Sequence, residues 1–436
     1  MKRKIYDDLL KWKTTGMQEP LMLIGARQIG KTYIIREFCR REFENYIEIN
    51  LFDEPEIIKI FSQNISTLEK FNRMKIYLDK DINIQNTIIF FDEVQESEEV
   101  ISALKFFNES EDNYKIICAG SLLGVKLKRM KTSFPVGKVK LLNMYPMDFE
   151  EFLMANGNDM LIDEIYKCYN HNYLIDEVLH DKCLSLYYLY LCVGGMPRAV
   201  ENLFNNNKDI LKFDKTIIRD IIESYLDDMN RYVENKNEAV KIEAIYRSIP
   251  RQLGNTSGKF QYSKVLKEAR EREYLSSLEW LLSSTMVLKC LRLNKVEVPP
   301  LAFTQDDYFK LYLSDIGILV NMLNINYNDI ILDKLLQYKG VLAENYVANS
   351  LMANRHDLIF WNSGNLAEID FVIYTDDGLI PIEVKGGNNT TSKSLGIYMK
   401  KYNPSYGIRI STKNFGYNDE TKIKSIPLYA TFCIKK

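Results

Sequence analysis

The stretch Gly25-Ala26-Arg27-Gln28-Ile29-Gly30-Lys31-Thr32 has the spacing GxxxxGK[ST], in which two glycines, a lysine and a hydroxyl residue stand at fixed offsets. An apolar run at 21–24 precedes this stretch, and an amphipathic run at 33–43 follows it. Glycines let a backbone loop wrap around an anion, and the N–H groups at a helix start point toward that anion. The sequence therefore predicts a strand, a phosphate-binding loop and a helix. The alternative is a glycine-rich turn in an ordinary strand–helix unit.

The residue types of this loop suit a nucleoside triphosphate and Mg²⁺. We expect Lys31 to contact the β- and γ-phosphates of ATP, and the Thr32 hydroxyl to ligate Mg²⁺. The nucleotide-binding stretch would consist of nine consecutive residues: Gly25, Ala26, Arg27, Gln28, Ile29, Gly30, Lys31, Thr32 and Tyr33. The predicted cofactors are therefore ATP and Mg²⁺.

Two carboxylates, Asp92 and Glu93, follow a second apolar run at 87–91. We expect this run to be a buried strand whose end carries both carboxylates. Asp92 would hold the Mg²⁺ shell, and Glu93 would orient or deprotonate the attacking water. The alternative is an acidic turn at the end of a strand.

A third polar residue, Ser121, follows the apolar run at 115–119. In a nucleotide-binding sheet this strand end would lie beside the γ-phosphate, and Ser121 would sense the phosphate or its water. A serine that caps the next helix is an equally open interpretation.

Short apolar runs and amphipathic stretches alternate through the first third of the chain. The runs at 46–51 and 115–119 join those at 21–24 and 87–91, with helical patterns between them. Strands that alternate with helices predict an α/β fold with a parallel P-loop sheet and helices on both faces. We place this core at 1–145.

Two further parts are expected after the core. Helical spacing dominates 146–235, where Gly194-Gly195-Met196-Pro197 predicts a tight turn. The region 236–327 has the element order of a winged helix. Its predicted elements are helices at 239–253, 262–270 and 274–283, and strands at 287–293 and 309–313.

Residues 328–436 are expected to form a small α/β domain, because a polar, Asn-rich stretch at 324–328 marks a boundary. Its predicted elements are a helix at 340–353, strands at 358–361, 368–374 and 380–384, and a hairpin turn at Asp376-Asp377-Gly378.

Three carboxylates and a lysine of this last part suit metal-dependent chemistry. Asp370 and Glu383 lie on the two strands of the predicted hairpin, and Glu344 lies on the preceding helix. Lys385 shares a face with Glu383 because the two are two residues apart on a strand. The carboxylates could hold Mg²⁺ or Mn²⁺, and the ammonium could position a water or stabilise a transition state. The alternative is a hairpin with solvated charges.

The composition of the 436 residues excludes several classes of protein. Lys and Arg number 57 and Asp and Glu 59, and this net charge of −2 excludes a uniformly basic nucleic-acid coat. The seven cysteines form no CxxC pair and no apolar leader precedes them, which predicts reduced thiols in the cytoplasm. No apolar run reaches the length of a bilayer, so we expect no membrane partner.

Residues 1–235 resemble an AAA+ P-loop ATPase of the bacterial and archaeal group. The resemblance rests on the loop 25–32, on Phe91-Asp-Glu-Val-Gln95 and on Leu142-Asn-Met-Tyr-Pro-Met-Asp-Phe-Glu-Glu-Phe-Leu153. The turn at 194–197 is similar to the lid signature of that group. The resemblance implies an α-helical lid and ATP hydrolysis coupled to conformational change.

The same resemblance implies basic residues that act on the γ-phosphate. Arg198 is the nearest basic residue to the lid turn and would be the sensor. In a homo-oligomer, Arg129 or Lys138 would supply a finger to the neighbouring subunit. Lys138 stands where many relatives carry arginine, and a lysine cannot reproduce the bidentate fork of a guanidinium.

Residues 335–436 resemble the domain of unknown function that is commonly fused to such ATPases. Its carboxylates are similar to those of the PD-(D/E)xK nuclease superfamily, which has a restriction-endonuclease-like fold. The residues that carry this likeness are Glu344, Asp370, Glu383 and Lys385. Ile369 replaces the usual proline, and the helix expected at 394–402 lacks a glutamine motif, so a domain that binds nucleic acid without cutting stays open.

The sequence thus predicts a cytoplasmic, Mg²⁺-dependent ATPase that acts on DNA or RNA. One alternative is a slow nucleotide switch that serves as a regulatory or defence scaffold and binds protein partners. Another is an ATP-gated nuclease. Basic residues support a nucleic-acid partner in two stretches: Lys126, Lys128, Arg129, Lys131, Lys138 and Lys140, and Arg247, Arg251, Lys259, Lys264, Lys267, Arg270 and Arg272.

Overall fold

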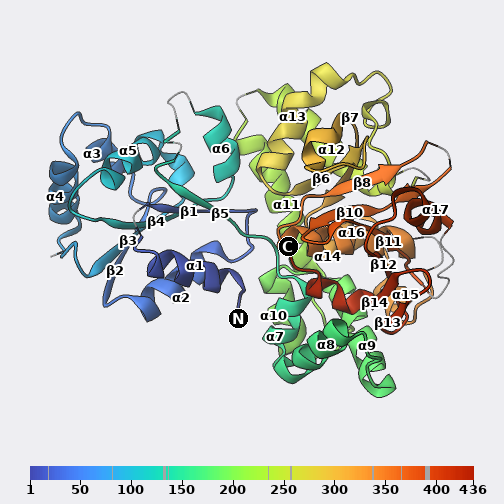
Figure 1. Cartoon of the computed structure of the whole chain (residues 1–436). Coiled ribbons are helices and arrows are strands. Elements are labelled where there is room, and N and C mark those ends of the chain that lie inside the picture. The colour runs from blue at the N-terminus through green and yellow to red at the C-terminus, as the bar shows by residue number, and fades with distance from the viewer. Residues whose placement is uncertain are drawn as a thin grey trace. The chain divides into compact units, whose positions relative to one another are not determined.

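The structure is a computed structural model of the whole chain (Figure 1). It describes residues 1–436 apart from 18, 81, 131–133, 136, 234, 256–257, 336–337, 365 and 388–392, so that Lys131 lies outside the described residues. The chain packs into two compact units. The amino-terminal unit comprises 2–145 and 283–285, and the carboxy-terminal unit comprises Met1, 146–282 and 286–436.

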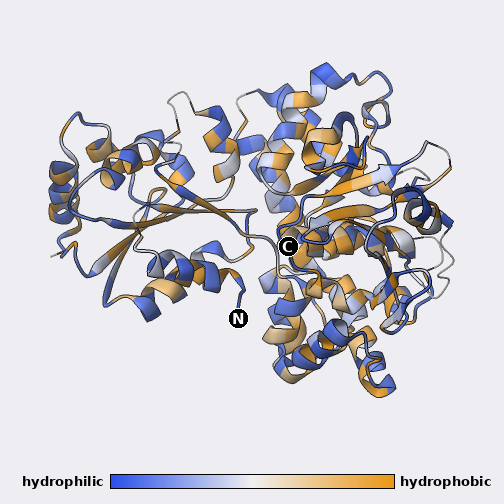
Figure 2. Ribbon diagram, in the orientation of Figure 1, coloured by the Kyte–Doolittle hydropathy of each residue, from blue (hydrophilic) through white to orange (hydrophobic). Residues whose placement is uncertain are grey.

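The amino-terminal unit is built on a five-stranded parallel sheet with the order β2-β3-β4-β1-β5. Its strands are β1 (Leu21–Ile24), β2 (Asn45–Asn50), β3 (Thr87–Asp92), β4 (Lys115–Ala119) and β5 (Lys140–Asn143). Every residue of β3 is buried, because a parallel sheet is covered on both faces. Figure 2 shows the hydrophobic character of the central strands.

Helices cover both faces of this sheet. On one face lie α1 (Ile5–Thr14) and α2 (Lys31–Glu42), and on the other lie α3 (Pro55–Phe61), α4 (Thr67–Leu78) and α5 (Glu98–Asn108) (Figure 1). The short elements η1 (Val94–Glu96) and α6 (Leu123–Arg129) follow β3 and β4. The predicted α/β architecture of this unit is confirmed. The sequence pattern missed β5, whose Leu141 is 45% exposed at the sheet edge and therefore forms no apolar run.

The carboxy-terminal unit begins with five helices, as the helical spacing predicted. They are α7 (Phe149–Ala155), α8 (Asp159–His171), α9 (Glu177–Val193), α10 (Pro197–Asn205) and α11 (Thr216–Arg231). The predicted tight turn separates α9 from α10.

The glycines of this turn pack directly against neighbouring backbone and a carboxylate. Gly194 has φ +71°, and a Cβ on Gly195 would lie 1.9 Å from Met147 O. Asp315 accepts a 2.6 Å hydrogen bond from Gly195 N through Oδ2 and a 3.0 Å bond from Ile318 N through Oδ1. Burial raises the pKa of Asp315 to about 6, although these backbone donors favour the ionised form. The turn is thereby fixed against residues 315–318.

The next elements are α12 (Lys236–Leu253), η2 (Tyr262–Lys264), α13 (Glu271–Ser283), β6 (Val287–Leu293), η3 (Pro300–Phe303) and β7 (Thr304–Leu313). The predicted helix over 262–270 is wrong, since only η2 and turns occupy this stretch. Leu266 is 55% exposed, and charged residues surround it, so the stretch has no apolar face to bury. A short helix without such packing is unstable.

Two mixed sheets complete this unit, with the orders β7-β6-β8-β9 and β10-β11-β12-β14-β13. Their remaining strands are β8 (Ile359–Asn362), β9 (Glu368–Ile369), β10 (Phe371–Thr375), β11 (Gly378–Val384), β12 (Gly407–Ser411), β13 (Gly416–Asn418) and β14 (Ile423–Pro427). The helical elements are α14 (Ile316–Met322), α15 (Tyr327–Ile331), α16 (Lys339–Ala353), α17 (Lys393–Tyr402) and η4 (Leu428–Cys433).

The strand predicted at 368–374 is two strands in two different sheets. Asp370 is the single residue between β9 and β10, and the chain changes sheet there. In addition, β8 pairs in parallel with β6, so strands expected in two separate domains share one sheet. The boundaries predicted at 235 and 327 stay predictions. Among the described residues, no helix has both the length and the apolar character that a membrane span requires.

Candidate functional sites

The loop between β1 and α2 follows the backbone path that its glycines predict. Gly30 caps the start of α2 with φ +94°, in the left-handed region that favours glycine. A Cβ on Gly25 would lie 2.4 Å from Met144 O, so this position requires the close approach that only glycine allows. The loop therefore ends at the start of a 12-residue helix, where N–H groups are available to an anion.

Lys31 lies inside the loop with 7% of its surface exposed. Its Nζ donates to Gly25 O at 2.8 Å and to Ala26 O at 2.7 Å. Arg3 holds the loop from outside, because its guanidinium donates to Ile29 O and to Tyr145 O, both at 2.7 Å. Phosphate oxygens, which are charged, are stronger acceptors for the Lys31 ammonium than these carbonyls.

Thr32, in the first turn of α2, contacts Asp92 at the end of β3. The Thr32 Oγ1 hydroxyl donates a 3.0 Å hydrogen bond to Asp92 Oδ2. Burial raises the pKa of Asp92 to about 6, and the nearby Glu93 adds to this effect, while the Thr32 bond opposes it. A hydroxyl and a buried carboxylate in contact fit Mg²⁺, which prefers oxygen ligands. These two residues would hold the ion.

Glu93 and Ser121 also lie together, at the ends of β3 and β4. Glu93 Oε2 accepts a 2.6 Å hydrogen bond from Gln95 Nε2 and a 3.2 Å bond from Ser121 Oγ. Ser121 does not cap α6, whose N-cap is Leu122. A Cβ on Gly120 would lie 2.1 Å from Gln95 Oε1, so Gly120 leaves room for Gln95. The Glu93 carboxylate is thus held in one orientation.

The remaining predicted nucleotide residues surround this arrangement. Ala26 and Ile29 are buried, Arg27 is half-buried, and Gln28 is exposed with φ +63°. Tyr33 is 53% exposed on the first turn of α2. Sequence reasoning missed Arg3 and the role of Gln95, because their contacts come from segments distant along the chain or depend on a side-chain direction.

Two of the predicted sensor and finger residues, Arg198 and Lys138, have ion-pair partners within their own units. Arg198 lies on α10 of the carboxy-terminal unit, 57% exposed, with Nη1 3.7 Å from Asp220 Oδ2. Lys138 pairs with Glu109 at 3.2 Å, and Arg129 ends α6. The roles of Arg198, Arg129 and Lys138 toward ATP stay predictions.

The predicted carboxylates of the carboxy-terminal unit come together from three elements: Glu344 from α16, Asp370 from the β9–β10 junction, and Glu383 from β11. Burial raises the pKa of Asp370 well above its ordinary value, and the neighbouring Glu344 and Glu383 raise it further. Asp370 Oδ2 accepts a 2.7 Å hydrogen bond from Val384 N. Lys385 Nζ lies 2.5 Å from Glu383 Oε1.

A residue that the sequence analysis did not select, Lys310, lies among these carboxylates. It is 2% exposed, and its Nζ is 2.8 Å from Glu344 Oε1 and 2.8 Å from Glu368 Oε1. Burial alone would lower the pKa of Lys310, but Glu344, Glu368 and Asp370 together raise it well above its ordinary value. The available signal was a lysine inside the apolar run 309–313, all five residues of which are buried.

The carboxylates as they stand do not fit a divalent metal ion. Within the described part of the chain, no group of three or more His, Cys, Asp or Glu side chains is arranged to hold one. The metal-binding role of Glu344, Asp370 and Glu383 therefore stays a prediction. We name Glu344, Glu368, Asp370, Glu383, Lys310 and Lys385 the carboxylate cluster.

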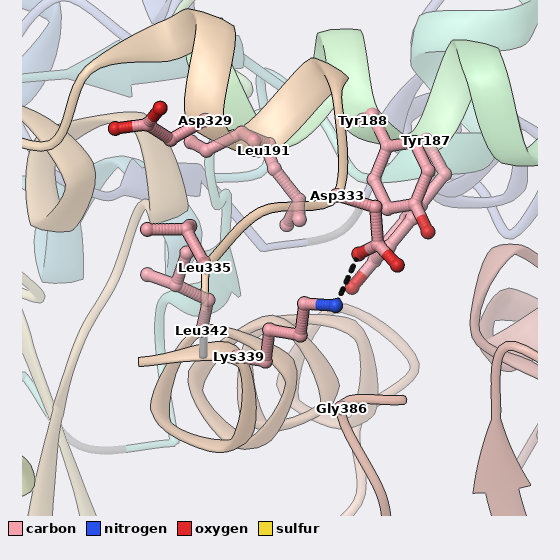
Figure 3. A pocket seen from close by; sticks show the side chains of 10 residues that line it. Tyr187, Tyr188, Leu191, Asp329, Asp333, Leu335, Lys339, Leu342 and Gly386 are labelled. Atoms are coloured by element: carbon pink, nitrogen blue, oxygen red, sulfur yellow. Dashed lines mark ion pairs between the residues drawn. The ribbon is translucent and has the colours of Figure 1, made fainter. Parts of the chain in front are cut away.

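A small pocket lies beside α9 and the start of α16 (Figure 3). Lys339 Nζ is 2.7 Å from Asp333 Oδ1 at its wall, next to Tyr188. Gly386 closes one side, where a Cβ would lie 2.4 Å from the Lys339 carbonyl carbon. None of the predicted site residues lines this pocket.

Three family models match successive parts of the chain. Residues 17–153 match an AAA domain. The chain carries an AAA domain. Residues 184–329 and 339–430 match two domains of unknown function, DUF8612 and DUF4143. No curated protein matches the chain.

Several solved structures are similar to the chain at low identity. The Walker-type ATPase PABY2304 of Pyrococcus abyssi is 16% identical, with a TM-score of 0.44, over 74% of this chain and 96% of that one. The ORC2 protein of Aeropyrum pernix, in ADPNP–ADP complexes, is 14% identical (TM-score 0.36; 76% and 92%). Drosophila ORC bound to DNA is 12% identical (TM-score 0.29; 74% and 98%). At identities and TM-scores this low, the likeness carries no information about the activity of the AAA-domain protein.

Proposed function

We propose that this AAA-domain protein is a Mg²⁺-dependent ATPase that hydrolyses ATP at the ends of β1, β3 and β4. The observation that carries this proposal is the 3.0 Å hydrogen bond between Thr32 Oγ1 and Asp92 Oδ2, because it brings the two predicted Mg²⁺ ligands into contact. Glu93 follows Asp92 directly, with its carboxylate held by Gln95 and Ser121. The magnesium ion, when bound, supplies positive charge to the phosphate oxygens.

Each residue of this site would have a different role in hydrolysis. Lys31 exchanges its bonds to Gly25 O and Ala26 O for bonds to phosphate oxygens, which stabilises the charge on the terminal group. Glu93 orients a water toward that group and accepts its proton. Ser121 fixes the carboxylate that does so. Arg198 would sense the γ-phosphate and couple hydrolysis to movement of α7–α11.

The test compares ATP binding and ATP turnover in the full chain. Lys31→Ala loses binding and turnover, whereas Glu93→Gln keeps ATP binding and loses turnover by at least about 100-fold, the usual contribution of a general base. Glu111→Gln is the matched control, since Glu111 is an exposed carboxylate of the same unit. Unchanged turnover in Lys31→Ala would refute the site.

The second part of the proposal is that the protein acts on or with DNA or RNA, through winged-helix and nuclease-like modules at 236–327 and 328–436. Five basic residues around α12, η2 and the start of α13 are exposed and support phosphate contacts: Arg247, Arg251, Lys267, Arg270 and Arg272. Nucleic acid should stimulate ATP turnover, and added salt should weaken this stimulation. A rate indifferent to DNA and RNA favours the alternative of a slow nucleotide switch that binds protein.

The ATP-gated nuclease is a separate alternative, supported by the proximity of Glu344, Asp370 and Glu383. Plasmid and branched DNA incubated with Mg²⁺ or Mn²⁺ test it, with Asp370→Ala as the inactive partner. If neither protein cuts any substrate, the nuclease interpretation is wrong, while the ATPase proposal is unaffected.

A further inference from the structure

The carboxylate cluster contains a cation that belongs to the chain itself. We propose that the Lys310 ammonium occupies the place of a divalent metal ion in this cluster. The native cluster is therefore metal-free, and removal of the ammonium opens a divalent-cation site built from Glu344, Asp370 and Glu383.

Two carboxylates and an aromatic ring surround the Lys310 ammonium. Its Nζ bridges Glu344 of α16 and Glu368 of β9 at 2.8 Å each, although the side chain starts from β7. The Phe360 ring centroid lies 5.2 Å from the same nitrogen. An ammonium with 2% of its surface exposed is stable only when paired, so these contacts fix it between the carboxylates.

The charges of the cluster do not balance. The cluster has four carboxyl groups and two ammonium groups, Lys310 and Lys385, which gives 2 − 4 = −2 when every group is ionised. Lys310 neutralises part of this excess of negative charge, which would otherwise attract a divalent cation. Without its single charge the excess becomes −3, and Mg²⁺ or Mn²⁺ is the cation type that carboxylate oxygens prefer.

The same cluster contains a buried carboxylate oxygen. Glu383 is 4% exposed, and its Oε2 atom is buried without a hydrogen-bond partner among the residues that the structure describes. Glu383 lies close enough to Asp370 to raise the pKa of Asp370. A buried carboxylate oxygen without a donor is costly, and a metal ion is one group that would satisfy it. Glu344 Oε1 accepts hydrogen bonds from Lys310 Nζ and from the Tyr312 hydroxyl, so in the native cluster this oxygen is directed at donors and not at a metal ion shared with Asp370 and Glu383.

The experiment measures Mn²⁺ binding to the full chain by electron paramagnetic resonance, without nucleotide. All proteins carry Asp92→Asn, which removes the carboxylate ligand of the nucleotide site. With Lys310 present, Asp370→Asn should not change Mn²⁺ binding. Lys310→Ala should gain one Mn²⁺ site, and the further change Asp370→Asn should abolish it. Lys289→Ala on β6, a lysine paired with Asp306 outside the cluster, should gain none.

Two results overturn the proposal. One is an Asp370-dependent Mn²⁺ site in the protein that retains Lys310. The other is a folded Lys310→Ala protein that gains no site. Lys310→Met, which refills the volume of the stem, is the second variant. Mn²⁺ should raise the thermal midpoint of either variant but not that of the Asp92→Asn protein that retains Lys310. The comparison that retains Lys310 tests the proposal even if both variants unfold, and ATP turnover is measured separately.

Discussion

Ser121 Oγ donates a 3.2 Å hydrogen bond to Glu93 Oε2, and so connects the end of β4 to the end of β3. Both residues were predicted to act near the terminal phosphate, but the sequence placed them on separate strands without a contact. The bond makes Ser121 a positioning residue for the Glu93 carboxylate. It also links Glu93, the proposed general base, to the strand that lies beside β1 in the sheet.

Ser121→Ala should lower the ATP turnover number by about 3- to 10-fold, which corresponds to the loss of one ordinary hydrogen bond. ATP affinity should change by less than a factor of two, which corresponds to about 0.4 kcal/mol of binding free energy. Steady-state turnover and equilibrium ATP binding check the two parts. Ser62→Ala, at an exposed serine of the same unit, is the control, and an equal loss in both variants would contradict the assignment.

Thr32→Ala should shift the Mg²⁺ concentration for half-maximal turnover upward by at least about 10-fold. The methyl group cannot ligate Mg²⁺, and it also removes the hydrogen bond to Asp92. Thr32→Ser keeps the hydroxyl and should retain a near-native Mg²⁺ requirement. A Mg²⁺ titration of turnover measures both, and an identical requirement in Thr32→Ala and the native chain would argue against this ligand.

Gly25→Ala should abolish ATP binding and lower the thermal midpoint. Its Cβ would lie 2.4 Å from Met144 O and 2.5 Å from Ile29 Cδ1, so the loop or the segment after β5 must move. Gly396→Ala is the matched control, because no atom outside its own helix, among the described parts of the chain, lies within 4 Å of its added Cβ, and alanine favours the helix α17. Thermal unfolding and ATP titration test the pair; normal ATP binding by Gly25→Ala would contradict the close approach.

The stability of the carboxy-terminal unit should respond to pH through Asp315. The pKa of this buried carboxyl is raised from 3.8 to about 6, so the folded state holds its proton more tightly than the unfolded state. Its contribution to the free energy of unfolding is therefore complete below about pH 4. It falls by about 1.4 kcal/mol per pH unit up to pH 6, and is constant above that value.

Asp315→Asn removes this titration, and thermal midpoints between pH 4 and 7 measure it. The advantage of the native chain over the variant should be largest at pH 4 and smallest at pH 7. Asp419→Asn, at an exposed carboxyl of the same unit, should show a difference from the native chain that does not vary in this way. A pH-independent difference for Asp315→Asn would mean that the raised pKa is not realised.

The sequence by itself determined the local backbone path of the candidate nucleotide site, and it predicted the residues of that site one by one. The motif 25–32 and the pair Asp92–Glu93 are local patterns, in which the spacing of glycines, the burial of one strand and the residue types at its end specify the backbone path. The strands at 21–24 and 115–119 begin and end where the pattern predicted. Their burial in a parallel sheet leaves a continuous apolar signal, which an exposed edge strand such as β5 does not have.

Only the tertiary structure decided the contacts that come from distant segments. Arg3 reaches Ile29 and Tyr145, Lys310 reaches Glu344 and Glu368, and neither contact has a local pattern in the chain. Asp370 lies where the chain leaves one sheet for another, because β9 pairs with β8 while β10 pairs with β11. Which carboxylates meet, and which cation compensates them, depends on strand pairing and helix packing, and these join residues that the sequence keeps far apart.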